Sequence, residues 1–170
     1  MSHKGLSEPH VLLASGNPRK MIRNLSLIFS EEQLGRIQGA VNSEAALLYK
    51  LAENHRDFAL AIDASQWWQV ISRLYYAAYN ARRALTLIND GAFSTDASDH
   101  KNVDGLPDGL QNKSTYANKL KNLREDRNLF DYSHLASEQD LMISVVDAKG
   151  FVSAFMAEAH GFLLERGVAV

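Results

Sequence analysis

An arginine and a histidine interrupt the apolar face of the stretch YANKLKNLREDRNLFDYSH, residues 116–134. Intervals of three and four residues predict one continuous helix, whose stripe would carry both polar side chains. A guanidinium stays charged and can donate two parallel hydrogen bonds to phosphate oxygens. An imidazole titrates near neutral pH and can act as acid or base. The pattern therefore suits anion binding and proton transfer on one helical face, which contains Tyr116, Leu120, Leu123, Arg127, Phe130 and His134.

Two neighbours of this pair have side chains that suit a supporting role. Asn128 could orient a phosphate group or a histidine, and Asp131, four residues after Arg127, could hold the guanidinium. A purely structural interpretation also stays open. Arg127 would then pair with Asp131 at the edge of the core, and His134 would only terminate the helix. Asn128 would be an ordinary polar residue of the helix surface or a helix cap.

Composition limits the class of protein. A chain of 170 residues with 46% hydrophobic residues can bury one sizeable core, which predicts a single main domain. A formal net charge of -2 gives no global attraction for nucleic acid, so any RNA contact must be local. The absence of cysteine excludes disulfides, thiolate zinc sites and thiol nucleophiles, and it agrees with the cytoplasm.

Several motifs that bind cofactors, metals or membranes are missing from the sequence. The chain has no glycine-rich phosphate loop, no HExxH sequence and no paired Glu-x-x-His motifs of the di-iron type. No segment approaches the roughly 20 apolar residues of a membrane span, and the N-terminus lacks the features of a signal peptide. We therefore expect no cofactor, no metal and no membrane association.

Residues 1–29 are expected to form an appendage to the main domain. Its predicted helices are too short to be stable alone. The basic residues Arg19, Lys20 and Arg23 lie beside apolar ones and could contact RNA. The pattern favours a helix with a solvated basic face and an apolar face that packs on the domain or contacts a second copy. The main domain is expected to cover residues 30–170.

Four capped, periodic segments predict an all-α fold. A capping box from Ser30 to Gln33 starts a helix that should run to about His55, and the Asp63–Gln66 pattern starts a second that should stop at Gly91. A third should begin at a cap on Asn112 or Ser114, and a fourth should be capped by Ser137 with Asp140 and end before Gly167. Together these segments predict an antiparallel four-helix up-and-down bundle.

The predicted connection between the second and third helices, residues 91–113, is the longest. Periodicity disappears there, and Gly, Asp, Asn and Ser accumulate. Within it, the sequence Ser98-Asp99-His100-Lys101 groups a potential base, a cation and hydrogen-bonding side chains. His100 is therefore a candidate contributor to a site, while a flexible solvated loop is the structural alternative.

The second and third helices carry a resemblance to the HEPN superfamily, which includes RNA-cleaving toxins, abortive-infection nucleases and CRISPR-associated ribonucleases. The segment SRLYYAAYNARRAL, residues 72–85, is similar to the YYAxxxAARALL stretch common in bacterial and archaeal members. Arg127 is followed by the polar residue Asn128 and, after six intervening residues in all, by His134, which resembles the superfamily's Arg-polar-His motif. The closing helix and the SDHKNV loop also match, so the resemblance covers roughly residues 31–166.

The resemblance implies a HEPN-like fold, an RNA substrate and a homodimer in which the sites of two subunits come together. It implies that Arg127 and His134 are catalytic and that His100 contributes from its loop. Asn128 and Asp131 would support them through the contacts described above. Because one histidine cannot readily act as acid and base at once, two subunits would share one cleft.

Two classes of function follow. The first is a metal-independent endoribonuclease. The expected role is the toxin of a toxin–antitoxin or other defence system, with a small nucleotidyltransferase-type antitoxin as partner. The second is a non-catalytic HEPN module that binds a nucleotide, an RNA or a protein. The second is favoured by Asp131-Tyr132, which is similar to a variant in members that lack the histidine, and by the absence of a tyrosine two residues after His134.

Overall fold

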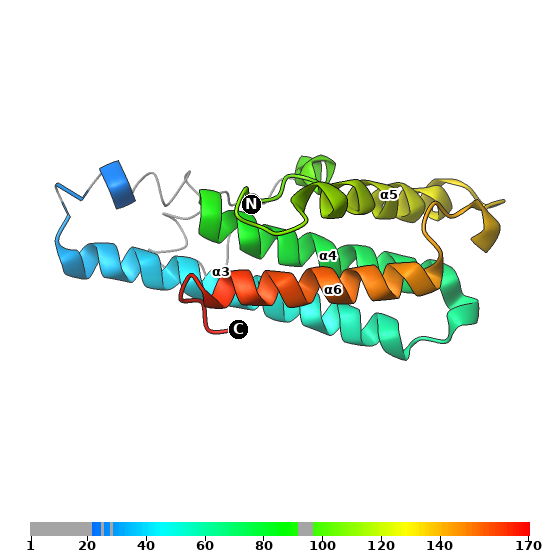
Figure 1. Cartoon of the computed structure of the whole chain (residues 1–170), viewed down its shortest axis with the longest axis horizontal. Helices are drawn as coiled ribbons and strands as arrows, with labels where there is room; N and C mark the ends of the chain where they lie inside the picture. The colour runs from blue at the N-terminus through cyan, green and yellow to red at the C-terminus, as the bar shows by residue number, and fades with distance from the viewer. Residues whose placement is uncertain (1–21, 25, 28, 92–96) are drawn as a thin grey trace.

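The computed structural model describes residues 22–24, 26–27, 29–91 and 97–170, and within these ranges the chain is helical and contains no strand (Figure 1). The predicted all-α class is confirmed as a helical bundle. The long helices are α3 (Glu31–Ala61), α4 (Trp67–Asp90), α5 (Lys113–Tyr132) and α6 (Val145–Leu164). Three short 3₁₀ helices separate them, namely η1 (Ala64–Gln66), η2 (Ala97–Asn102) and η3 (Glu138–Asp140).

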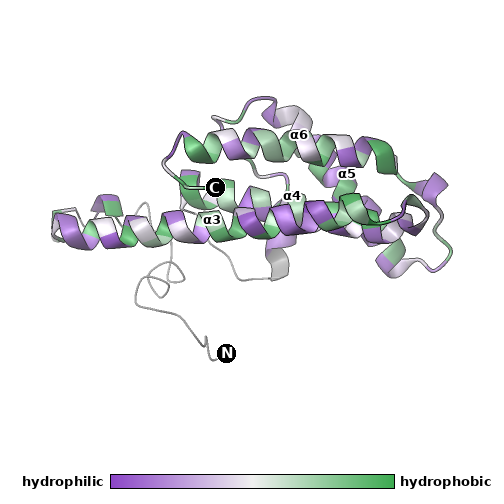
Figure 2. Ribbon diagram, turned by 90° about the horizontal axis from the view of Figure 1, so that it is seen from below, coloured by the Kyte–Doolittle hydropathy of each residue, from purple (hydrophilic) through white to green (hydrophobic). Residues whose placement is uncertain are grey.

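Most of the predicted N-terminal appendage, including Arg19 and Lys20, lies outside the described residues. Ile22, Arg23 and Asn24 form a helical turn, and Arg23 is exposed as its charge requires. The first turns of α3 project past the ends of the other helices in Figure 2. Their exposure agrees with this view, because Ile37 is the first fully buried side chain of α3.

Helix α4 is the centre of the bundle, since it packs against α3, α5 and α6. Its small residues Ala77, Ala78, Ala81 and Ala84 are fully buried, which lets neighbouring backbones approach closely. Larger side chains, such as those of Leu74, Tyr75 and Phe155, fill the rest of the core.

The predicted cap of the first helix is confirmed, whereas the predicted cap of the second is wrong. Asp63 accepts from the amide of Ser65 at 2.8 Å and caps η1, and α4 begins behind Gln66, which makes no side-chain capping hydrogen bond. The amide of Gln33 donates to Ser30 Oγ at 3.3 Å and the amide of Ser30 donates to Gln33 Oε1 at 2.9 Å, which completes the capping box. Helix α3 does not stop near His55 but continues to Ala61, because no strong terminator intervenes. Gly91 ends α4 in the left-handed conformation with φ 66°, as predicted.

The predicted start of the last helix is wrong. Ser137 and Asp140 do form a capping box, but it caps η3, and α6 begins only at Val145 behind the cap Ser144. The reason is Asp126 on α5, whose buried carboxylate accepts the amides of Met142 at 2.7 Å and Ile143 at 3.0 Å. These amides are therefore not available for a helix that would continue from η3.

The predicted helix over residues 116–134 is also two residues too long. Helix α5 ends at Tyr132, and Ser133 adopts extended backbone with φ -128° and ψ 104° while its amide closes the last turn on Leu129. His134 lies in the following turn. The expectation that a continuous helix points His134 and Arg127 in the same direction is therefore wrong.

The connection between α4 and α5 is the longest between the long helices, as predicted, but its described part is not a flexible solvated loop. It contains η2, and its apolar residues Val103, Leu106 and Leu110 are buried. Burial of these side chains fixes the segment on the bundle. His100 therefore occupies a defined position.

Candidate functional site

A polar cleft that contains several of the predicted residues lies between η2 and the C-terminal half of α5. Its volume is about 670 Å³. One wall carries His100 and Lys101, and the other carries residues from successive turns of α5. The cleft is lined by Tyr75, His100, Lys101, Arg124, Glu125, Arg127, Asn128 and Tyr132.

Arg127 lies at the boundary between this cleft and the core. Its guanidinium pairs with Asp131 at 2.8 Å, donates from Nη1 to Asn128 Oδ1 at 3.2 Å and donates from Nη2 to the Tyr76 hydroxyl at 3.2 Å. Its Nε is buried and has no partner in the described part of the chain. The predicted contact with Asp131 is confirmed, and Asn128 is placed beside the guanidinium.

Two tyrosine rings of α4 flank the Arg127 guanidinium. Arg127 Cζ lies 6.0 Å from the ring centroid of Tyr75 and 5.8 Å from that of Tyr76. Cation–π attraction at such distances stabilises a guanidinium that is largely removed from water. The aromatic helix α4 therefore contributes directly to the site.

His100 is held in the cleft by aromatic packing and one hydrogen bond. Its ring stacks on Tyr79 with centroids 4.1 Å apart and planes inclined by 21°, and its Nδ1 lies 2.8 Å from the Tyr75 hydroxyl oxygen. Partial burial lowers the pKa of His100 below its ordinary value, and the positive charge of Arg127 lowers it further. The imidazole is therefore mainly neutral at neutral pH, with Nε2 left for another partner.

The Tyr75 hydroxyl stays protonated under the same conditions. Burial raises the pKa of Tyr75 most strongly, with Tyr79 adding to the rise and Arg127 opposing it. A neutral phenol can either donate to Nδ1 or accept from it. In the second case the His100 Nε2 carries the lone pair.

A buried ion pair positions the turn that carries His100. Arg82 Nη1 lies 2.9 Å from Asp99 Oδ2, and the two side chains are only 9% and 11% exposed. The Tyr79 hydroxyl donates to the same carboxylate at 3.2 Å, and Arg82 Nε donates to the Gly105 carbonyl at 3.1 Å. Helix α4 thus anchors both ends of the segment around His100.

Helix α5 binds the same segment from the other side. Arg124 Nη1 donates to the Lys101 carbonyl at 3.0 Å, and Lys121 pairs with Asp104 at 3.0 Å. The segment is also tightly packed at Gly105, where a Cβ would lie 3.2 Å from the Asn102 carbonyl oxygen and 3.3 Å from Arg82 Nη2. The cleft is therefore bounded by a fixed backbone.

His134 does not line this cleft. It is exposed in the turn after α5 and makes no hydrogen bond, ion pair or ring contact with the residues that the structure describes. The structure therefore brings together Arg127, Asn128, Asp131 and His100, whereas His134 stands apart from them within one chain.

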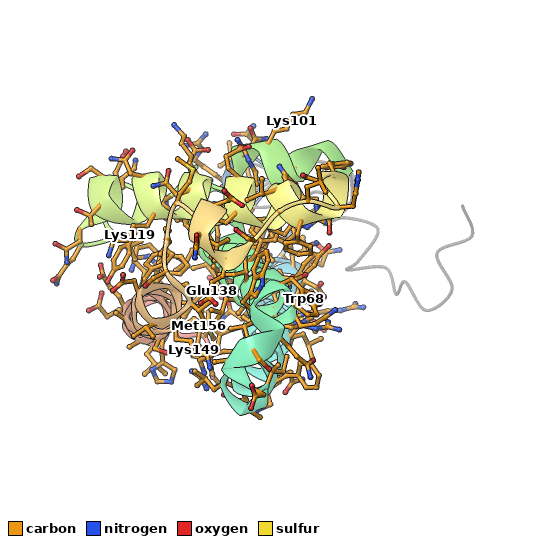
Figure 3. All side chains as sticks on the ribbon, turned by 90° about the vertical axis from the view of Figure 1, so that its right-hand side faces the viewer. Trp68, Lys101, Lys119, Glu138, Lys149 and Met156 are labelled. Carbon is orange, nitrogen blue, oxygen red and sulfur yellow. The ribbon has the colours of Figure 1, made fainter. Side chains whose placement is uncertain are left out.

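Sequence reasoning missed Arg124 as part of the site, whereas it had noted Lys101 as the cation of the 98–101 group. Lys101 is exposed and, in Figure 3, projects outward from the molecule. Together with Arg127 they bring three cations to a cleft with one lining acid, Glu125, which pairs with Arg124 at 2.6 Å. The available signal was the spacing of Arg124 three residues before Arg127.

Among the described residues, no three His, Asp or Glu side chains converge in a way that would hold a metal ion. None of the described helices combines the length and apolarity of a membrane span. The chain matches no model of a protein family, and neither a curated protein nor a solved structure matches it significantly.

Proposed function

We propose that the chain is a metal-independent endoribonuclease of the HEPN type. The observation that carries the proposal is the cleft in which Arg127, His100 and Asn128 meet under two tyrosine rings. An antiparallel four-helix arrangement is part of the proposal. It is supported by Figure 1, where the colour along each of the four long helices runs opposite to that of the helix before it.

The chemistry would use the 2′-hydroxyl of RNA as nucleophile. A neutral imidazole takes the 2′-hydroxyl proton, the 2′-oxygen attacks phosphorus, and the bond from phosphorus to the 5′-oxygen breaks as that oxygen gains a proton. The products are a 2′,3′-cyclic phosphate and a 5′-hydroxyl. Arg127 would stabilise the extra negative charge of the pentacoordinate phosphorus, with Asn128 orienting the phosphate.

His100 suits the role of base, since its pKa is lowered and, when Nδ1 donates to Tyr75, its Nε2 carries the lone pair and has no hydrogen-bond partner among the described residues. His134 suits a different role because it is exposed beside the exposed side chains of Tyr132 and Leu135. In a two-fold homodimer formed around this end of α5, the His134 of one protomer would reach the cleft of the other. It would then supply the proton to the leaving oxygen.

The biological role that we propose is the toxin of a toxin–antitoxin or defence system, with a nucleotidyltransferase-type antitoxin as partner. It rests on the resemblance of residues 72–85 and of the Arg127–His134 motif to HEPN toxins. Expression of the wild-type chain in cells should then be toxic, and expression of an Arg127→Ala variant should be tolerated.

The direct test is cleavage of single-stranded RNA by the purified protein in EDTA. We expect wild type to leave cyclic phosphate ends, and we expect Arg127→Ala, His100→Ala and His134→Ala each to lose at least about two orders of magnitude in rate. Lys149→Ala on α6 is the control, because it removes one charge from a different helix. Equal cleavage by wild type and Arg127→Ala at equal melting temperatures would refute the proposal.

One observation favours the second candidate, a HEPN module that binds RNA, a nucleotide or a protein without cleaving. Asp131 already neutralises Arg127 at 2.8 Å, so a bound phosphate must compete with this carboxylate. Under this alternative, Asp131→Asn tightens binding of an oligonucleotide and no cleavage appears at any enzyme concentration.

A further inference from the structure

A second group of cationic and aromatic side chains lies on α3 and α4, next to Tyr76 but outside the cleft. Phe58 on α3 exposes 53% of its surface. Arg73 Cζ lies 5.2 Å from the centroid of the Phe58 ring. The pair forms an exposed aromatic surface with a fixed positive charge beside it.

The charge of Arg73 is not neutralised by an acidic neighbour. Its side chain makes no ion pair or hydrogen bond among the described residues, and its Nε is buried without a partner. The acids on the adjoining part of α3 bind other cations, since Glu53 pairs with Lys50 at 3.1 Å and Asp57 pairs with Arg56 at 2.8 Å. An unpaired guanidinium with this geometry is a ready binding group for a phosphate.

Tyr76 connects this group to the proposed catalytic cleft. Its ring centroid lies 5.8 Å from Arg127 Cζ and 5.6 Å from the ring centroid of His55 on α3. The charge of Arg73 in turn reaches His55, whose pKa is lowered mainly by burial and further by that guanidinium. Arg127, Tyr76 and His55 therefore contact one another in series across α5, α4 and α3, and the charge of Arg73 acts on the last of them.

We propose that Phe58, Arg73 and His55 form a subsite for a flanking nucleotide of single-stranded RNA, in which a base stacks on Phe58 and a phosphate binds Arg73. The inference rests on the proposed function, because it extends the strand that Arg127 would hold. Stacking on an aromatic ring tolerates any base, and a neighbouring guanidinium tracks the backbone. Because of this subsite, the affinity for RNA should increase with the length of the strand and should not depend on its base sequence.

The test measures binding of 2′-O-methyl oligoribonucleotides, which cannot be cleaved, by fluorescence anisotropy at several salt concentrations. For a decamer, Phe58→Ala and Arg73→Gln should each weaken binding roughly tenfold, and Arg73→Gln should lower the slope of log affinity against log salt by about 0.7. A dinucleotide, which reaches only the cleft, should bind all proteins equally. Lys119→Gln is the matched control, because it removes a charge 5.5 Å from the ring of a buried phenylalanine, Phe151.

The outcomes separate the inference from the proposed function. If wild type binds neither oligonucleotide, the RNA function fails and the subsite with it. If wild type binds the decamer, and Arg73→Gln binds it equally well with an unchanged salt slope, only the subsite is refuted. If Phe58→Ala instead changes the sedimentation coefficient while RNA affinity stays constant, this surface is a protein interface and the inference is again overturned.

Discussion

The Asp99→Ala substitution tests how the turn that carries His100 is held. Asp99 and Arg82 form an ion pair at 2.9 Å with both side chains about nine-tenths buried. Removing one partner of a buried pair leaves the other charge without compensation, which typically costs about 3 to 5 kcal/mol. The Gly105 carbonyl still accepts from Arg82 Nε, so we take the lower end, about 3 kcal/mol.

The assay is urea unfolding followed by the fluorescence of Trp67 and Trp68, with thermal melting as a second measure. For a chain of this length, a loss of about 3 kcal/mol lowers the melting temperature by about 6 to 12 °C. The control is Asp108→Ala. It breaks another ion pair of the same connection, with Lys113 at 2.6 Å, but the Asp108 side chain is fully exposed. This control should melt like wild type.

A second readout separates loss of stability from loss of position. The resonances of the His100 ring should shift in Asp99→Ala, because Asp99 is adjacent in sequence and its carboxylate also accepts from Tyr79, on which the ring stacks. They should remain unchanged in Asp108→Ala. The reasoning is refuted if Asp99→Ala unfolds at the same urea concentration as Asp108→Ala, since a buried pair would then be no stronger than an exposed one.

Three further predictions concern the same region. Asp126→Ala removes the acceptor of the Met142 and Ile143 amides and should destabilise the fold by about 2 kcal/mol in urea unfolding; a change within error would contradict the capping role. Folding lowers the pKa of His100 from 6.5, because the folded protein favours the neutral imidazole. The neutral imidazole therefore contributes fully to stability above pH 6.5, and this contribution is lost as the pH falls through the pKa of His100 in the folded protein. Melting temperatures between pH 7.5 and 5 should therefore decline less in His100→Gln than in wild type, and parallel curves would contradict this. Tyr75→Phe removes the hydrogen bond to His100 and should cost about 1 kcal/mol, with a change of imidazole tautomer visible by NMR; an unchanged tautomer would argue against the contact.

Local signals predicted the helices well because each depends on residues close in sequence. The capping box at Ser30 and the glycine at 91 act through their own backbone neighbours, and both have the predicted geometry. The Ser137 box failed as a marker for the last helix because Asp126 binds the amides of residues 142 and 143 from another helix. Periodicity within a segment carries no information about such a contact.

The candidate site was less predictable for the same reason. Arg127 and Asp131 lie one turn apart, so their contact followed from helix geometry. His134 was assigned to that helix because residues seven apart share a face, but the helix ends two residues before it. His100 reaches the cleft only because a buried ion pair of Arg82 fixes its turn, and the sequence of a polar loop does not reveal that pairing.

The Arg82–Asp99 pair and Arg127 have different roles, so experiments can separate effects on stability from effects on chemistry. Both side chains of the ion pair that fixes η2 are buried, so removing the pair lowers the free energy of unfolding. Any loss of function would follow from this loss of stability. Arg127 is one-quarter exposed and binds Asp131, Asn128 and the Tyr76 hydroxyl, all of which can turn to water when it is removed. Its substitution should therefore leave the fold nearly intact. A loss of RNA cleavage in Arg127→Ala without loss of stability, set against a loss of both in Asp99→Ala, would assign the guanidinium to the reaction and the buried pair to the scaffold.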